Sequence, residues 1–560
     1  MGEKKDILRE IDKEIRDILY RYIKTQSFTY TEREKEAEQF LMGHLSEIPY
    51  FKENPQYYGT YPIPGDSFGR AVCYAMVKGR GDDTVVFVHH NDVVEIEDFK
   101  LLKSYAFSPD ELAQELYKIK DSLPSDARKD LEDDTFLFGR GTADMKGGGA
   151  IQLALLRRYS ELKDFKGNVI VIAVPDEENL SAGMRAAVKL LEELKNTYGL
   201  NYKIMINSEP HQRKDFTQGI FSEGSVGKLM PFVYVRGYLS HIGKVFEGFN
   251  PLNLMSEIVR STELNMDFCD AMGAESAPPP TWLYLKDSKK QYDVSMPLSA
   301  SGCFSILTLD QTPAEVMEKV ETVCTKAFGK ILEEMNESYA RFCQVAEPVA
   351  KELPWKVKVT DFASLCEEAA GAHGAAFREN YEKKVAHLSQ SMREGTINII
   401  ESNFALVEFV FDYIEDLSPR VVCGLIPPYY PNVSNLYFEK LDPQVKTLAQ
   451  DLDAYTWETY RQHYTKEYFY TGISDLSYTS IREGNRTLEA LERSMPLFGD
   501  FYSIPVAAIE TITMPCMNIG PWGKDFHKLT ERVCREDLFE RTPRIINKAV
   551  SLLLDDPSLA

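Results

Sequence analysis

A glycine-rich stretch at residues 139–149, Gly-Arg-Gly-Thr-Ala-Asp-Met-Lys-Gly-Gly-Gly, constrains the fold more than any other feature of the chain. It follows an apolar, strand-like run at 135–138 and precedes a helix-like run at 150–156, so Asp144 is predicted at a strand-to-helix turn. Glycine lets the backbone approach a ligand closely, and open α/β sheets bind ligands at the carboxyl ends of their strands. Taken alone, this stretch is better explained as a tight turn with a capping aspartate, because glycine-rich turns are common and no phosphate-binding Lys-Ser/Thr follows.

Three further apolar, strand-like runs, at residues 84–88, 167–174 and 202–207, also end in residues that can bind metals. The side chains that follow these runs are His90, Asp92, Glu177, Glu178 and Glu209. A histidine can coordinate a metal while a nearby carboxylate fixes its tautomer, and of two adjacent glutamates one can bind a metal while the other transfers protons. Each pair alone is equally compatible with surface histidines or solvated acids. Together with Asp144, they predict a metal site at one edge of a sheet.

Size and charge limit the class of protein. A chain of 560 residues is too long for one core, so two or more domains are expected. The net charge of −22 argues against nucleic acid or an anionic membrane as a partner. Nine scattered cysteines without a Cys-x-x-Cys pair, together with the absence of a signal-peptide core or a membrane-length apolar run, predict a cytoplasmic protein.

The order of the expected elements predicts an α/β protein with an insert. A catalytic domain with a mixed sheet flanked by helices is expected at residues 1–212 and 363–560, and a small α+β domain at residues 213–362. The strand-like run at 420–426 is expected to rejoin the first sheet, and a further strand is expected at 507–512. The loop at 518–527 would then deliver His527 to a following helix.

The ordered motifs resemble the di-zinc family of aminoacylases, acetylornithine deacetylases, succinyl-diaminopimelate desuccinylases and related carboxypeptidases. They are His90-x-Asp92, the stretch at 139–148, the acids at 176–178, Glu209, Gly237-x-x-x-His241 and His527-x-x-x-Glu531. Within that family, the length, the acidic segment at 95–134 and the stretch at 520–528 are most similar to the arginine-utilisation (RocB-like) deacylases.

The resemblance implies roles for these residues. It implies two Zn²⁺ ions, with Mn²⁺ or Co²⁺ as substitutes, bridged by Asp144. His90 and Glu209 would complete one site, and Glu178 and His527 the other. Asp92 would orient His90, and Glu177 would move the proton of the attacking water to the leaving amine.

The resemblance also implies a homodimer that forms through the insert, with the insert acting as a lid. In relatives the histidine at the place of His241 reaches the partner's site and stabilises the oxyanion, whereas a core or surface histidine is the simpler interpretation. Residues 307–313 read Leu-Thr-Leu-Asp-Gln-Thr-Pro, where relatives often have Asp-x-Arg before the Thr-Pro turn. The arginine that holds a substrate carboxylate in relatives therefore has no counterpart here.

The predicted function is metal-dependent hydrolysis of an amide bond in a small molecule or short peptide, with an N-acyl amino acid or an arginine-related compound as the substrate. A di- or tripeptidase of the same family and a non-catalytic binding protein on the same fold are the alternatives. The chain has no Gly-x-Ser-x-Gly elbow, no phosphate-binding Gly-Lys-Ser/Thr and no His-Glu-x-x-His, which argues against unrelated hydrolases and nucleotide enzymes.

Overall fold

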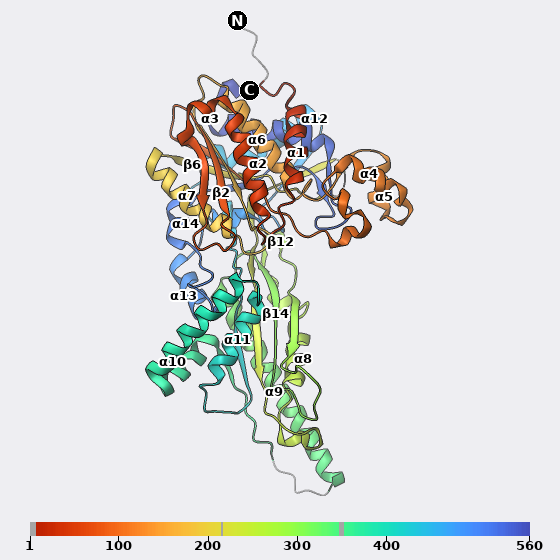
Figure 1. The fold of residues 1–560 in the computed structure, drawn as a ribbon, viewed down its shortest axis with the longest axis vertical. Coiled ribbons are helices and arrows are strands. Elements are labelled where there is room, and N and C mark those ends of the chain that lie inside the picture. The colour runs from red at the N-terminus through yellow and green to blue at the C-terminus, as the bar shows by residue number, and fades with distance from the viewer. Residues whose placement is uncertain (1–6, 214, 216, 347–351, 560) are drawn as a thin grey trace. The chain divides into compact units, whose positions relative to one another are not determined.

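The computed structural model describes residues 7–213, 215, 217–346 and 352–559, and the chain divides into two compact units (Figure 1). The first unit comprises Met1–Val226, Val433–Ile481 and Ala507–Ala560. The second comprises Gly227–Asn432 and Arg482–Val506. The chain thus leaves and re-enters each unit, and each unit is described separately below.

The first unit is built on an eight-stranded mixed sheet with the strand order β1-β2-β5-β3-β6-β19-β7-β18. Its strands are β1 (Tyr58–Pro62), β2 (Ala71–Lys78), β3 (Asp83–His90), β5 (Asn168–Val174), β6 (Asn201–Asn207), β7 (Gln218–Ser222), β18 (His463–Glu467) and β19 (Cys516–Asn518). The central strands β5, β3, β6 and β19 run parallel to one another. Their carboxyl ends therefore lie at one edge, which is where ligands bind in open α/β sheets.

Helices cover this sheet, which explains why its central strands are apolar on both faces. Side chains such as Phe87, Val171 and Ile206 join one apolar cluster with residues of α1, α6 and α15. The helices of the first unit are α1 (Ile11–Tyr22), α2 (Glu34–Glu47), α3 (Pro49–Glu53), α4 (Pro109–Lys118), α5 (Ser125–Glu132), α6 (Lys146–Ser160), α7 (Ala182–Tyr198), α12 (Pro443–Tyr460), α14 (Val506–Ile512) and α15 (Thr542–Leu553). Within the described parts of the chain, no helix combines the length and apolar composition that a membrane crossing needs.

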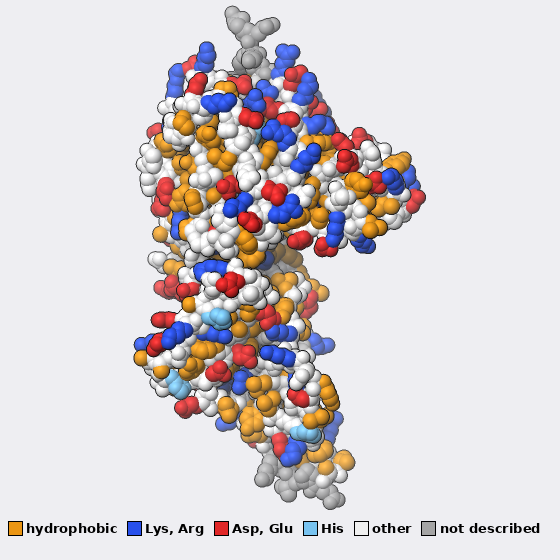
Figure 2. Space-filling model, viewed as in Figure 1, with side chains coloured by type: hydrophobic (Ala, Val, Ile, Leu, Met, Phe, Trp, Pro, Cys, Tyr) orange, Lys and Arg blue, Asp and Glu red, His pale blue; other side chains and the backbone are white. Residues whose placement is uncertain are grey.

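The segment at 95–134 forms a lobe that contains α4 and α5 and projects from the main sheet of the first unit (Figure 1). Both acidic and basic side chains cover the face of the lobe seen in Figure 2. Its apolar side chains form a cluster of their own around Phe99, Phe107 and Leu112, which includes Phe136 and Trp522. A small sheet of the order β20-β21-β4 adjoins the lobe, formed by β4 (Phe136–Phe138), β20 (Gly523–Lys524) and β21 (Arg532–Cys534).

The second unit contains a sheet of the order β13-β14-β10-β16-β15, with β9 paired to β14. Its main strands are β9 (Gly227–Leu229), β10 (Pro231–Arg236), β13 (Thr281–Asp287), β14 (Ser299–Thr308), β15 (Val359–Asp361) and β16 (Arg420–Leu425). Its helices are α8 (Pro251–Thr262), α9 (Pro313–Ala346), α10 (Phe362–Arg393), α11 (Ile399–Phe411) and α13 (Gly484–Ser494). Two short pairs lie outside these sheets: β8 (Gly224–Ser225) with β17 (Val433–Ser434) in the first unit, and β11 (Ala271–Met272) with β12 (Glu275–Ser276) in the second.

The structure differs from the expected elements at three places. The run at 420–426 does not rejoin the first sheet: β16 pairs with β10 and β15, so residues 363–432 belong to the second unit. The expected strand at 507–512 is the helix α14, because Ala508, Ile509 and Ile512 bury one helical face, and a short apolar run does not by itself distinguish strand from helix. The strand before Asp144, β4, lies in the small sheet and not in the main one.

Candidate metal centre

Two strand ends of the main sheet and one turn bring the first group of candidate ligands together. His90 is the last residue of β3, Glu209 follows β6, and Asp144 lies in the turn before α6. The Nε2 atom of His90 lies 3.0 Å from Oδ1 of Asp144 and 3.5 Å from Oε1 of Glu209. These three residues form a group whose donor atoms all lie within 4.8 Å of one another.

A second group shares Asp144 with the first. Nε2 of His527 lies 2.9 Å from Oε1 of Glu178 and 3.2 Å from Oδ2 of Asp144, so the two oxygens of Asp144 face different histidines. Asp144, Glu178 and His527 form another group with donor atoms within 4.8 Å, and His90 forms a third with Glu177 and Glu178. The side chain of His527 is 48% exposed, whereas that of His90 is 1% exposed, so the second group is the open side of the cluster.

Asp92 links β3 to the pair of glutamates. Nδ1 of His90 lies 3.1 Å from the backbone oxygen of Asp92 and 3.5 Å from its Oδ1. The two carboxylate oxygens of Asp92 accept the backbone N–H groups of Glu177 and Glu178, each at 3.2 Å. Asp92 therefore contacts the ring nitrogen of His90 that faces away from the cluster, and it also fixes the backbone that carries the glutamates.

The electrostatics of the cluster show a surplus of carboxylate charge. Burial raises the pKa of Glu177 and of Glu209 well above the usual range. Burial alone would lower the pKa of His90, but Glu209 and Asp144 outweigh it and raise that pKa well above its usual value. Hydrogen bonds with Asp144 and a neighbouring glutamate raise the pKa of His527 to about 10. A cluster with more buried carboxylates than imidazoles attracts cations.

The glycines after Asp144 allow close packing of α6 against the strand ends. A Cβ atom on Gly148 would lie 2.2 Å from the backbone oxygen of Ser208, and one on Gly149 would lie 2.6 Å from the ring of His89. His89 is buried and its Nδ1 lies 2.9 Å from Oε1 of Gln152 in α6, so it points away from the candidate ligands. Gly148 and Gly149 thus allow the close approach of α6 to the strand ends.

A buried arginine holds the loop that carries the two glutamates. Nη1 of Arg70 lies 2.6 Å from Glu34 and 2.9 Å from Asp176, the residue before Glu177. Glu34 in turn accepts the backbone N–H of Asp176 at 2.8 Å. No motif in the sequence pointed to Arg70 or Glu34, because they belong to segments that come near the site only in the folded chain.

A further buried carboxylate, Asp475, was also not predicted. Among the described residues, neither of its oxygens has a hydrogen-bond partner. Burial raises the pKa of Asp475 to about 7, and the charge of Asp475 contributes to the raised pKa values of Glu177 and Glu209. A lone aspartate gives no signal in a single sequence, so only the structure could place Asp475, at the start of a short 3₁₀ helix (Asp475–Tyr478), here.

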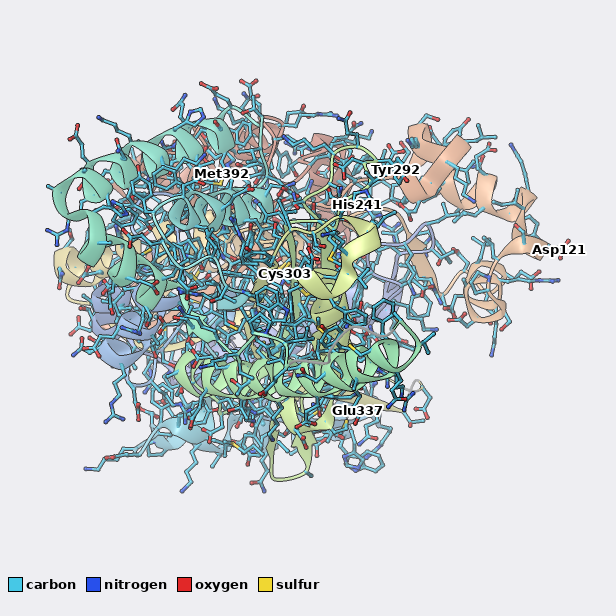
Figure 3. All side chains as sticks on the ribbon, turned by 90° about the horizontal axis from the view of Figure 1, so that it is seen from below. Asp121, His241, Tyr292, Cys303, Glu337 and Met392 are labelled. Carbon is cyan, nitrogen blue, oxygen red and sulfur yellow. The ribbon has the colours of Figure 1, made fainter. Side chains whose placement is uncertain are left out.

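His241 lies in the second unit, at the start of a short 3₁₀ helix (Ile242–Glu247), and it is exposed. Its segment bridges to Ser295, and Ile242 donates its N–H to the backbone oxygen of Val294 at 3.0 Å. Figure 3 labels His241 together with Tyr292 from that neighbouring loop. The other seven candidate residues all belong to the first unit.

The donor set fits divalent metal ions. Imidazole and carboxylate donors are the ligands that zinc takes in proteins, and in di-metal sites the two ions lie roughly 3.5–4 Å apart. A carboxylate shared between two donor groups is what such a pair of ions needs, and Asp144 is shared in this way.

Comparison with known proteins agrees with this chemistry. The model of peptidase family M20/M25/M40 matches residues 120–550, and the chain belongs to that family of metallohydrolases. It is 31% identical over 554 residues to the uncharacterised protein YqjN of Bacillus subtilis, covering 97% of this chain and 96% of that protein. It is also 29% identical over 523 residues to protein RocB of Bacillus subtilis, covering 92% and 90% of the two chains. Its fold is similar to that of the di-peptidase Dug1p of Saccharomyces cerevisiae, with a TM-score of 0.53, 12% identity and 99% of each chain covered.

Proposed function

We propose that the chain hydrolyses an amide bond with the help of two divalent metal ions, Zn²⁺ or in its place Mn²⁺ or Co²⁺. His90 and Glu209 would hold one ion, Glu178 and His527 the other, and Asp144 both. The single observation that carries this proposal is the position of Asp144, whose two oxygens face His90 and His527 at 3.0 and 3.2 Å.

The metal ions, Glu177 and Asp92 would each have a separate role in the reaction. Bound ions of this kind polarise a carbonyl group and make a water molecule a stronger nucleophile at neutral pH. Glu177 would accept the proton of the attacking water and pass it to the leaving amine, and its raised pKa suits a group that must both take and give a proton. Asp92 would keep His90 in the orientation that leaves Nε2 free to coordinate.

The proposed substrate is an N-acyl amino acid or an arginine-related compound. Its support is the resemblance to the arginine-utilisation proteins, and RocB is similar over almost the whole chain. The alternative, a di- or tripeptidase, is supported only by the similar fold of the di-peptidase Dug1p. A panel of N-acyl arginine and ornithine derivatives against di- and tripeptides, assayed with zinc, manganese and cobalt, would decide between them.

Two variants test the roles of the centre by metal analysis. Asp144→Ala is expected to lose both ions, and full metal content in that variant would refute the bridging role. Glu177→Gln is expected to keep both ions and to lose turnover by about 10²–10⁴-fold, because it would transfer protons without binding metal. Loss of metal from Glu177→Gln would instead make Glu177 a ligand, which its place in the third donor group allows.

We also propose a homodimer in which His241 completes the site of the partner chain and the second unit acts as a lid. The strand β13 supports this proposal, because it lies at the edge of its sheet and its Leu283 and Leu285 side chains are exposed. Mixing inactive His241→Ala chains with inactive Glu177→Gln chains under subunit exchange is the test. Heterodimers regain one working site if His241 acts in trans; no recovery despite heterodimer formation would refute it.

The cysteines agree with the reducing compartment, the cytoplasm, that we propose for the protein. All nine lie in described parts of the chain, and all are free thiols. Disulfides are rare in such compartments.

A further inference from the structure

The loop that carries His527 is attached directly to the turn that carries Asp144. Glu531, four residues after His527, is fully buried, and its Oε1 accepts the backbone N–H of Gly141 at 2.7 Å. The same oxygen lies 3.4 Å from the backbone nitrogen of Asp144. The backbone oxygen of Glu531 accepts the N–H of Gly139 at 3.0 Å. One residue thus holds the Asp144 turn at three points.

The second carboxylate oxygen of Glu531 fixes an arginine. Oε2 accepts a hydrogen bond from Nη1 of Arg140, whose side chain is 1% exposed. The other end of the guanidinium donates to the backbone oxygen of Glu95 at 3.1 Å and to Asp98 at 3.3 Å, both in the lobe of residues 95–134. Of the described residues, none accepts a hydrogen bond from Nε of Arg140, so the guanidinium is held through its two terminal nitrogens. Glu531 is therefore hydrogen-bonded to Arg140 on one side and to the Asp144 turn on the other.

We propose that Glu531 is a positioning residue that sets the separation between Asp144 and His527. This inference rests on the proposed metal centre. The two residues belong to segments almost four hundred positions apart (Arg140 to Glu531 is a separation of 391), so their distance depends on the contacts between those segments. His527 itself is half exposed. Lys524 and Arg532 tie its loop to Asp130 in the lobe, whereas Glu531 ties it to the Asp144 turn.

The proposal predicts an asymmetric effect on metal binding. In the first group, His90 and Glu209 are held by β3 and β6, and only the Asp144 turn contacts Glu531. In the second group, both the Asp144 turn and the loop of His527 depend on the contacts of Glu531. Weakening the anchor should therefore weaken the second group more than the first. Partners that orient metal ligands contribute about 10–100-fold to metal affinity.

The main variant is Glu531→Gln, which keeps the size of the side chain. A glutamine has a single acceptor oxygen, so either the N–H of Gly141 or the guanidinium of Arg140 must face an amide N–H₂. The full chain is titrated with Co²⁺ and followed by calorimetry and by visible absorption, with His527→Ala as the reference for a centre that lacks the second group. We expect the wild type to bind two Co²⁺ ions. In Glu531→Gln, the Co²⁺ affinity of one site should stay within about threefold of wild type, and that of the other site should fall by about 10–100-fold. The absorption spectrum of Glu531→Gln should shift toward that of His527→Ala.

Asp537→Asn is the matched control. Asp537 is as buried as Glu531, pairs with Arg213 and accepts the backbone N–H of Trp522 at 3.0 Å. Its hydrogen bonds to other described residues include neither Asp144 nor Gly141. It should leave both affinities and the spectrum unchanged. If Glu531→Gln does not fold, Glu531→Asp serves instead, because it keeps the charge beside Arg140 and withdraws the oxygen from Gly141, and the same one-site loss is expected. Equal weakening of both sites, or wild-type binding at both, would overturn the positioning role. A wild-type chain that binds no Co²⁺ would instead refute the proposed function itself.

Discussion

Replacement of Arg70 by methionine should destabilise the first unit strongly, and the loss should depend on pH. The side chain of Arg70 is 3% exposed and pairs with Glu34 at 2.6 Å, with Asp66 at 2.6 Å and with Asp176 at 2.9 Å. Methionine fills a similar volume but leaves all three carboxylates buried without a cation. Removing one partner of a buried ion pair costs about 3–5 kcal/mol of unfolding free energy.

The sign of the pH dependence follows from two of these carboxylates. Burial already raises the pKa of Glu34 and of Asp176 above their unfolded values of 4.5 and 3.8, and Arg70 opposes that rise. Without Arg70 both folded-state pKa values rise further, so the folded variant binds more protons than the unfolded one. Its stability must then fall as the pH rises. The difference from wild type should be largest near pH 8 and should shrink as the pH falls toward the unfolded values.

The assay is urea unfolding at a series of pH values in a background of Trp282→Phe and Trp355→Phe. The two remaining tryptophans, Trp457 and Trp522, lie in the first unit, so their fluorescence reports on that unit. Arg80→Ala is the control, since its pair with Asp164 is more than 70% exposed on both sides and such pairs contribute about 0–1 kcal/mol. A large loss that is the same at every pH would show that packing, and not unpaired charge, is responsible. A loss no greater than that of Arg80→Ala would refute the argument.

Three further variants test other contacts. Gly148→Ala should lower the unfolding free energy by about 1–3 kcal/mol in thermal unfolding, because its Cβ would lie 2.2 Å from Ser208, whereas Gly43→Ala, with nothing within 4 Å, should not. Asp475→Asn should raise the unfolding free energy of the metal-free protein at pH 8 and leave it unchanged at pH 4, because burial raises the folded-state pKa of Asp475 to about 7 from an unfolded 3.8. A larger gain in unfolding free energy at pH 4 than at pH 8 would contradict this. Asp130→Ala should speed hydrogen exchange at residues 520–532, since Lys524 and Arg532 both donate to Asp130 at 2.7 Å, whereas Asp121→Ala, at an exposed position, should not. Unchanged exchange in Asp130→Ala would show that Asp130 does not hold the loop to the lobe.

The sequence predicted the fold class and the strand ends that carry the candidate ligands, but not which sheet each strand joins. His90, Glu177 and Glu209 follow strands that are apolar on both faces, and parallel strands must bring such ends to one edge, so their proximity could be inferred. The period of the run at 420–426 marks a buried strand but does not say which sheet receives it. That choice depends on long-range pairing of β16 with β10, which a single sequence does not contain.

The surroundings of the site were also beyond prediction. Arg70 and Asp475 act through burial and through neighbours from distant segments, and neither burial nor neighbours can be read from residue type. Glu531 differs, because its spacing after His527 was visible in the sequence, but its hydrogen bonds to the turn of Asp144 were not. A motif can thus mark a residue without showing what it contacts.

The position of β19 between β6 and β7 has a consequence for the order in which the chain can fold during synthesis. The ribosome releases β6 and β7 early, whereas β19 follows only after the whole second unit has been made. Until then the sheet lacks the strand that joins β1-β2-β5-β3-β6 to β7-β18, and β6 presents an unpaired edge. His90, Asp144 and Glu209 are all synthesised before that gap is closed, while His527 arrives just after β19. The nascent chain therefore holds four of the five proposed metal ligands beside an open sheet edge, and the same late segment completes both the sheet and the proposed centre.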